Sequence, residues 1–313
     1  MAKKVIIDCD PGIDDAVALS MALFDSRLEV LAVTAVAGNV PAQQVNRNVQ
    51  AIIDQLDPPR IPRIGSAMEH RQDQLADARH IHGEDGLGQI ELPESTHHQQ
   101  HPADKVICDL AHAFPNELTV VCLGPLTNVA QALRRDAQLA GLLHDLVIMG
   151  GSVNCRGNVT PAAEFNIYCD PGSADEVFLA PVTKTLVPLD VTCQVVFSID
   201  LLNQLPPESS RAGWLLTRIL PQLFRSYHQV LGQERINLHD AVALLAVSDP
   251  ELFELKPMAG KVVVEEGVAA GATIFDRRPN RRWPENLDVA CTVDATAALQ
   301  RIIKLLKLAG ERS

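Results

Sequence analysis

The segment VIIDCDPGIDDAVAL occupies residues 5–19 and carries four carboxylates within eight positions, at Asp8, Asp10, Asp14 and Asp15. Residues 5–7 form an apolar run that predicts a buried strand, and the Pro-Gly pair after Asp10 predicts a turn. The apolar spacing that follows Gly12 predicts a helix. A strand, a turn and a helix in this order form the unit from which parallel sheets are built.

The same order recurs along the first two thirds of the chain. Further strands are predicted at residues 28–36, 118–123, 146–149 and 185–189. Helices are predicted at residues 14–24, 43–56, 104–114, 126–133 and 173–179. Because strands alternate with helices, the strands are expected to lie side by side in a largely parallel sheet.

After residue 189 the pattern changes to long helical stretches at residues 209–231 and 239–246. Two short alternating runs follow and predict a small antiparallel appendage at residues 261–264 and 272–275. An amphipathic helix over residues 295–308 is expected to stop at Gly310. Residues 72–100 are rich in His, Gln, Asp and Glu, which predicts a long surface loop of a kind that is usually functional or disordered.

The composition agrees with this architecture. The chain has 313 residues, of which 47% are hydrophobic and 4% aromatic, as expected for helices that cover a parallel sheet. This length allows two small domains or one larger unit. We find no repeat and no Pro/Gly/Ser linker. We therefore predict one α/β domain over residues 1–313, with a mainly parallel, Rossmann-like central sheet flanked by helices and a small antiparallel and helical C-terminal appendage.

Charge and cysteine usage exclude several classes of function. The formal net charge of -12 repels phosphate backbones and anionic membranes, so neither nucleic acid nor a membrane is an expected partner. The seven cysteines form no CxxC pair, which argues against a zinc site. The apolar stretch before Asp8 is too short for a signal peptide, and no segment reaches the roughly 18 apolar residues of a membrane span. We therefore expect a reduced, cytoplasmic protein.

The four clustered carboxylates indicate a bound cation. They follow a strand, at the edge where open α/β sheets bind ligands, and they repel one another unless some are protonated or a cation lies among them. Oxygen donors favour Ca²⁺ or Mg²⁺ over zinc or copper. Helix capping by Asp14 or Asp15 is the simpler alternative, but it accounts for only one or two of the four. Asp8 could merely brace its neighbours.

DCDPGIDDA resembles the amino-terminal signature of the inosine-uridine-preferring nucleoside hydrolase family. Other segments resemble that family in the same order along the chain. They are VAGN with Asn39, HGEDGLG at residues 82–88, LGPLTN at 123–128, MGG at 149–151, GNVTPAAEFN at 157–166, and the pair His239-Asp240. The resemblance spans nearly the whole chain. It implies hydrolysis of the N-glycosidic bond of ribonucleosides to ribose and free base.

Carried over position by position, the resemblance implies a calcium site and a sugar site. The calcium ligands would be the carboxylates of Asp10, Asp15 and Asp240 and the main-chain carbonyl of Leu123. The residues expected at the ribose hydroxyls are Asp14, Asn39, Asn158, Glu164 and Asn166. The residues expected near the sugar or the base are His82, Phe165 and Tyr227. The resemblance also implies a homodimer or a homotetramer.

The expected chemistry depends on the bond that breaks. Cleavage develops positive charge on the sugar and negative charge on the departing base, and a carboxylate-rich pocket stabilises the sugar. We expect Asp10 to deprotonate a calcium-bound water that attacks the anomeric carbon. His239 is expected to protonate the departing base, because histidine is readily tuned to donate a proton near neutral pH. His82 lies in a glycine-rich loop and is expected to fold over bound substrate as part of a lid.

Two alternatives belong to other functional classes. A Mg²⁺-dependent phosphatase of the haloacid dehalogenase type also has a DxD pair after its first strand, but here Pro11 follows the second aspartate and no matching lysine segment occurs. A catalytically inactive nucleoside-binding protein would have lost Asp10, Asp15 or Asp240, and all three are present. Purine and pyrimidine bases both remain open as leaving groups. Residues 152–157 match no pattern with a known role.

Overall fold

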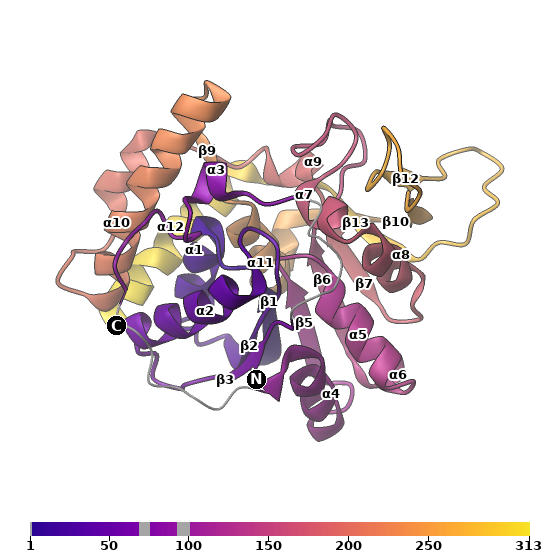
Figure 1. The fold of residues 1–313 in the computed structure, drawn as a ribbon, viewed down its shortest axis with the longest axis horizontal. Helices are drawn as coiled ribbons and strands as arrows, with labels where there is room; N and C mark the ends of the chain where they lie inside the picture. The colour runs from indigo at the N-terminus through magenta and orange to yellow at the C-terminus, as the bar shows by residue number, and fades with distance from the viewer. Residues whose placement is uncertain (1, 69–75, 93–100) are drawn as a thin grey trace.

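The computed structural model describes residues 2–68, 76–92 and 101–313. Its centre is a nine-stranded sheet in the order β10-β13-β7-β6-β5-β1-β2-β3-β4 (Figure 1). Neighbouring strands are parallel except for β10 and β13. The strands are β1 (Lys3–Cys9), β2 (Leu28–Ala35), β3 (Arg63–Ser66), β4 (His101–Pro102), β5 (Leu118–Cys122), β6 (Asp145–Met149), β7 (Lys184–Val187), β10 (Phe253–Met258) and β13 (Leu287–Val293). The predicted mainly parallel sheet is confirmed.

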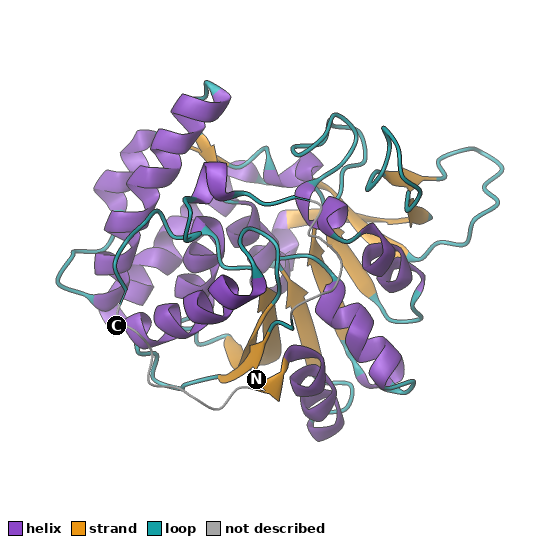
Figure 2. Cartoon of the chain, viewed as in Figure 1, coloured by secondary structure: helices purple, strands orange, loops and turns teal. Residues whose placement is uncertain are grey.

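Helices cover both faces of this sheet (Figure 2). One face packs against α1 (Ile13–Ala22), α2 (Ala42–Leu56), α10 (Arg211–Ser226), α11 (His239–Ser248) and α12 (Ala295–Arg312). The other face packs against α4 (Ala103–Ala113), α5 (Thr127–Arg135), α6 (Leu139–Leu142) and α8 (Pro171–Leu179). In β1, Val5 and Ile7 belong to the first core and Ile6 to the second. Both faces of the strand are therefore buried, which is why its sequence is an uninterrupted apolar run.

The strand order reverses between β1 and β5. From β1 the chain continues to β2 and β3 on one side, and it then returns to place β5, β6 and β7 on the other side. In open α/β sheets the connections leave such a point in opposite directions and open a crevice at the carboxyl ends of the strands. Asp10 follows β1 and Leu123 follows β5, so both lie at this crevice.

The C-terminal appendage has the predicted character. β11 (Gly260–Val262) and β12 (Thr273–Phe275) form an antiparallel pair. A second small antiparallel pair joins β8 (Val196–Phe197) to β9 (Ile236–Asn237), just before α11 begins. The remaining short elements are α3 (Arg79–His82), α7 (Phe165–Cys169), α9 (Leu189–Thr192), the 3₁₀ segments η1 (Ile199–Gln204) and η3 (Pro250–Leu252), and the π-helical turn η2 (Tyr227–Leu231).

Three predictions need correction. Gly310 does not stop the last helix, which runs on to Arg312; a Cβ at Gly310 would overlap with Pro206, so the glycine serves a close approach of two segments. The strand predicted to reach residue 189 ends at Val187, and Leu189 begins α9 after Pro188. His82 is not on a surface loop, because it is 8% exposed and lies within α3. Residues 72–75 and 93–100 of that predicted loop lie outside the described residues.

The predicted helix over residues 209–231 is present as α10 followed by η2, which begins at Tyr227. Single π-helical turns in a helix are frequent at functional sites. Among the described residues, no helix is both long and apolar enough to cross a membrane.

Candidate active site

A pocket of about 220 Å³ opens at the crevice beside β1 and β5. Its lining includes every residue that the sequence predicted at the sugar or the base, together with Asp10, Leu123, His239 and Asp240. The predicted sugar and base residues in the lining are Asp14, Asn39, His82, Asn158, Glu164, Phe165, Asn166 and Tyr227. Segments far apart in the sequence thus converge on one cavity.

Three carboxylates approach one another closely enough to share a cation. One oxygen each from Asp14, Asp15 and Asp240 lies within 4.8 Å of the others, and all three residues are buried. This group differs from the predicted ligand set in one member, because Asp14 takes the place of Asp10. Asp15 belongs to the third position of α1, where one of its oxygens accepts a hydrogen bond of 2.8 Å from the Gly12 N–H.

The electrostatics of the cluster favour a bound cation. Burial raises the pKa of Asp10, Asp15 and Asp240 well above the usual range, and neighbouring carboxylates raise it further. In this cluster, Oδ1 of Asp15 is buried without a hydrogen-bond partner among the described residues. Unpaired buried oxygens and mutual repulsion are both relieved by a hard cation with oxygen ligands. The donor set therefore fits a metal ion.

The Asp10 carboxylate is held from three sides. Its Oδ2 accepts a hydrogen bond of 2.6 Å from the Asn39 N–H. A Cβ at Gly38 would overlap with that oxygen, and a Cβ at Gly124 would lie 2.6 Å from Oδ1. The two glycines, one from VAGN and one from LGPLTN, therefore leave the space that the carboxylate occupies.

Asp8 is buried and is not among the residues that line the pocket. Its Oδ1 accepts hydrogen bonds of 2.5 Å from the Thr34 hydroxyl and 2.8 Å from the Asn128 amide. Burial raises the pKa of Asp8 to about 7, although both hydrogen bonds lower it. The Asn128 amide also donates to the Ala35 carbonyl at 2.8 Å, so Asp8 links the ends of β2 and α5.

Glu164 and Asn166 belong to the start of α7. The Glu164 carboxylate caps this helix by accepting hydrogen bonds from Asn166 N–H and Ile167 N–H, and it also accepts 3.0 Å from Gly151 N–H. Gly151 has φ of +71°, which favours glycine, and this explains the second glycine of the MGG motif. Burial raises the pKa of Glu164 to about 7. The Asn158 amide oxygen accepts 2.8 Å from the Phe165 N–H.

Two histidines face the carboxylates. His82 Nδ1 accepts a hydrogen bond of 3.1 Å from the Ile13 N–H, which leaves Nε2 3.9 Å from an Asp14 oxygen. His239 begins α11, and its Nδ1 lies 2.8 Å from the Thr192 hydroxyl. Burial lowers the pKa of both rings, and the Asp14 carboxylate partly opposes this shift. An imidazole ring next to carboxylates can take up a proton and pass it to a substrate.

Comparisons with known proteins agree with this arrangement. The sequence profile described as "Inosine-uridine preferring nucleoside hydrolase" matches residues 5–300. The chain belongs to this family. Uridine nucleosidase 1 of Arabidopsis thaliana is 35% identical over 97% of this chain and 94% of its own length. The non-specific ribonucleoside hydrolase RihC of Salmonella enteritidis PT4 is also 35% identical, over 97% and 98%.

Solved structures give the same result. The purine-preferring ribonucleoside hydrolase from Gardnerella vaginalis superimposes with a TM-score of 0.91 at 31% identity, covering 99% of this chain and 100% of that one. The plant nucleoside hydrolase PpNRh1 gives a TM-score of 0.87 at 30% identity, covering 99% of each chain. This chain is therefore a nucleoside hydrolase, an enzyme that cleaves the N-glycosidic bond of ribonucleosides.

Part of the lining of the nucleoside hydrolase pocket is apolar. Ile81, Leu223 and Leu231 line the pocket together with Phe165 and Tyr227. Tyr227 is 8% exposed, and burial raises the pKa of its phenol above the usual range, so the hydroxyl stays protonated. An apolar lining with a small number of convergent polar groups is the usual form of a small-molecule site.

Residues 152–157 have a structural role in this nucleoside hydrolase. Val153 N–H and Asn154 N–H donate hydrogen bonds of 2.7 and 2.8 Å to the Asp190 carboxylate. Ser152 and Thr273 exchange hydrogen bonds that tie the segment to β12. The segment therefore joins α9 and the appendage to the loop that carries Asn158.

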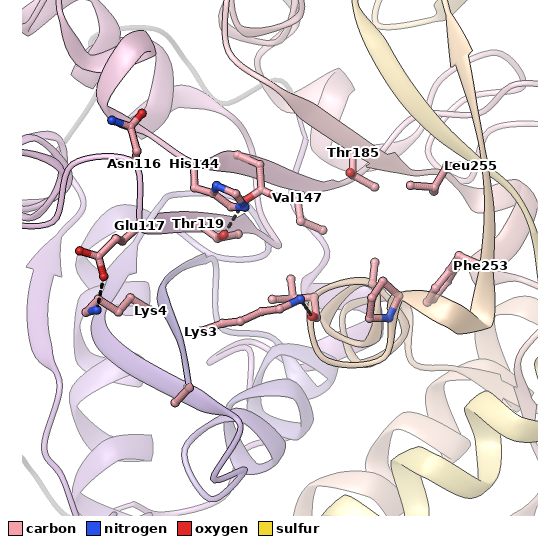
Figure 3. Close-up of a pocket in the computed structure, with 15 residues that line it drawn as sticks. Lys3, Lys4, Asn116, Glu117, Thr119, His144, Val147, Thr185, Phe253 and Leu255 are labelled. Carbon is pink, nitrogen blue, oxygen red and sulfur yellow. Dashed lines mark hydrogen bonds and ion pairs between the residues drawn. The ribbon is translucent and has the colours of Figure 1, made fainter.

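A second cavity, of about 370 Å³, lies at the opposite ends of the strands (Figure 3). Lys3 Nζ donates 2.7 Å to the carbonyl of Val247, at the end of α11. Lys4 pairs with Glu117, and Thr119 donates to Asp145. These charges already have partners, and the carboxylate cluster lies at the other edge of the sheet.

Several residues of the site were not predicted. Gly38, Gly124 and Asn128 lie in motifs that the sequence analysis quoted, but a role for them depends on neighbours in space. Thr192 gave no sequence signal. Among the apolar lining residues, Leu223 and Leu231 were predicted only as part of a helix.

Proposed function

We propose that this nucleoside hydrolase transfers the ribosyl group of a free ribonucleoside to water in the pocket at β1 and β5, with Ca²⁺ as its metal. The observation that carries the proposal is the convergence of buried carboxylates with polar side chains in one cavity. Asp10, Asp15, Asp240 and the Leu123 carbonyl would hold the ion. When bound, Ca²⁺ lowers the pKa of water and attracts vicinal hydroxyls. An all-oxygen ligand set suits Ca²⁺, which accepts flexible coordination, whereas Mg²⁺ demands a smaller and nearly ideal octahedral site.

Asp10 is proposed as the general base. It takes a proton from the attacking water as the water oxygen bonds to the anomeric carbon and the bond to the base nitrogen breaks. The Asp10 carboxylate fits between Gly38 and Gly124 and accepts a hydrogen bond from the Asn39 N–H. These contacts support the role, because a general base needs a fixed orientation. The doubly protonated ring of His239 then supplies the proton that the departing base takes up, and the ring becomes neutral.

Sugar binding is proposed for Asp14, Asn39, Asn158, Glu164 and Asn166, and contacts to the sugar or base for His82, Phe165 and Tyr227. Their position in the pocket lining supports the proposal. A 2'-deoxyribose would leave some of these buried polar groups unpaired, so deoxynucleosides should be poor substrates. Nucleotides should be excluded because the carboxylates repel phosphate.

The assembly and the compartment are also proposals. We propose that residues 1–313 act as one nucleoside hydrolase domain, and that copies associate as a homodimer or homotetramer in the cytoplasm. The family resemblance supports the oligomer, and the net charge of -12 agrees with a protein that avoids anionic surfaces. Multi-angle light scattering of the purified protein tests the oligomer.

The experiment that tests the activity measures ribose release from uridine, inosine, cytidine and adenosine and from their 2'-deoxy counterparts. Each assay is run before and after prolonged treatment with a calcium chelator, and again after Ca²⁺ or Mg²⁺ is restored. We expect release that requires the metal and the 2'-hydroxyl and that Ca²⁺ restores best. No release from any ribonucleoside while calcium is bound, as measured by elemental analysis, would contradict the proposal.

A further inference from the structure

The ring of His239 is held by a side chain from a distant segment. Its Nδ1 lies 2.8 Å from the hydroxyl oxygen of Thr192, which is 47 residues earlier in the chain. Thr192 is fully buried at the end of α9. Because Nδ1 is engaged by this hydroxyl, Nε2 is the ring nitrogen that remains for the pocket, whose lining includes His239.

Thr192 itself is fixed by its main chain. Its N–H donates a hydrogen bond of 3.2 Å to the Pro188 carbonyl. Its carbonyl accepts hydrogen bonds of 3.3 Å from the Val195 N–H and 3.4 Å from the Asn237 side chain. Asn237 belongs to β9, two residues before His239. Hydrogen bonds therefore join the end of α9, which carries the hydroxyl, to the segment that leads into His239.

A hydroxyl is suited to this position because its oxygen can accept a hydrogen bond from a ring N–H. A doubly protonated ring donates its Nδ1–H to this oxygen, and the neutral ring that remains after Nε2 has lost its proton still carries the same Nδ1–H. The orientation of the ring can thus stay the same before and after a proton is transferred at Nε2. Valine has almost the same shape as threonine but cannot accept this hydrogen bond.

We infer that Thr192 is a positioning residue, whose hydroxyl orients His239 so that Nε2 faces the departing base. The inference rests on the proposed role of His239 as proton donor. Thr192 acts only through His239 and touches neither the metal ligands nor the sugar residues by any contact described above. Its loss should therefore affect the leaving group and spare the rest of the site.

The test compares Thr192→Val with Thr192→Ser in the full-length, metal-loaded enzyme. Two substrates are used: uridine, whose base needs a proton, and p-nitrophenyl β-D-ribofuranoside, whose phenolate leaves without one. For Thr192→Val we expect kcat for uridine to fall about 10-fold with little change in KM, the size of one lost hydrogen bond to a catalytic group. We expect kcat for the aryl riboside to change less than about 3-fold, and Thr192→Ser to restore turnover of uridine.

Thr217→Val is the matched control. It also replaces a threonine hydroxyl, but this one donates 2.7 Å to the Gly213 carbonyl within α10, outside the site. Thr217→Val should leave the turnover of both substrates unchanged. Turnover of the aryl riboside reports whether each variant is folded and holds its metal.

Three outcomes would overturn the inference. Equal losses on both substrates would assign Thr192 a structural role only, unchanged turnover of uridine would show that the hydroxyl is dispensable, and failure of serine to restore turnover would exclude the hydroxyl as the cause. His239→Ala separates this result from the proposed function. If His239→Ala reduces turnover of uridine far more than turnover of the aryl riboside and Thr192→Val does not, only the role of Thr192 is wrong. If His239→Ala reduces turnover of both substrates equally, the proton-donor role of His239 is wrong.

Discussion

The side-chain amide of Asn166 donates a hydrogen bond of 2.7 Å to the main-chain carbonyl of Leu123. The carbonyl is the proposed metal ligand at the end of β5, and the amide belongs to α7. Because a carbonyl oxygen has two lone pairs, it can accept this hydrogen bond and still face a cation. The contact therefore fixes the direction in which the carbonyl points.

Replacing Asn166 should consequently weaken metal binding. Outer partners of metal ligands typically contribute about 10–100-fold to metal affinity, and we expect a loss of this size for Asn166→Ala. Calcium affinity is measured by competition with a fluorescent chelator. Asn203→Ala, at an exposed position, is the control. Unchanged calcium affinity in Asn166→Ala would mean that the Leu123 carbonyl is not a metal ligand.

Gly124→Ala should reduce turnover because the new methyl group would lie 2.6 Å from Asp10 Oδ1 and 2.7 Å from a Val36 methyl group. The Asp10 carboxylate must then move, and a displacement of about 1 Å at a reacting group costs on the order of 100-fold in rate. Gly141→Ala is the matched control, since no atom lies within 4 Å of its added methyl group. Equal turnover in the two variants would show that the position of Asp10 does not limit the rate.

Asp10→Ala should reduce kcat by about 100-fold or more, since general bases typically contribute 10²–10⁴-fold. The fold should persist, because removing one of several crowded carboxylates relieves repulsion in the metal-free protein. Steady-state ribose release gives kcat, and circular dichroism gives the fold. Near-normal turnover would overturn the proposed role of Asp10.

Removal of the metal should make stability fall as the pH rises. Asp8 and Glu164 have pKa values raised to about 7, and Asp10, Asp15 and Asp240 have pKa values well above the usual range. Between about pH 4 and pH 7 the folded metal-free protein therefore holds protons that the unfolded chain releases, and the free energy of unfolding decreases. The lowered pKa values of His82 and His239 act in the opposite direction, but they are outnumbered.

Calcium should remove this dependence, because the bound ion replaces the protons and binds more tightly as the pH rises. Urea unfolding of metal-free and calcium-loaded protein at pH 5, 6, 7 and 8 measures both effects. The two curves should diverge with rising pH by several kcal/mol. Parallel curves would mean that the carboxylates are not the metal site.

The sequence predicted those parts of the fold in which burial leaves a local pattern. Strands buried on both faces, such as β1, appear as apolar runs. β10 and β13 were missed because most of their side chains are exposed or only partly buried, so neither strand forms an uninterrupted apolar run. Gly310 was misread because its neighbour Pro206 is distant in sequence.

The residues of the candidate site were predicted through the family resemblance, but the residues that hold them in position were not. Gly38 and Gly124 matter because a side chain at either position would overlap with the Asp10 carboxylate, and only the structure shows that they lie beside Asp10. Likewise, Thr192 and Asn128 act through contacts with segments far away in the chain. Such contacts leave no mark in the local spacing of residues.

His239→Ala should reduce turnover of natural nucleosides far more than turnover of the aryl riboside. The base of a nucleoside leaves as a poor, negatively charged group unless it takes up a proton, and an acid catalyst typically contributes about 10²–10⁴-fold to such a step. Asp240, the next residue, should still bind calcium, so the metal content of the variant is measured alongside. His228→Ala is the control, because His228 is exposed and pairs with Glu234 outside the pocket lining. Equal losses on both substrates, with the metal retained, would remove His239 from the proton-donor role and direct attention to His82, the other histidine that faces Asp14.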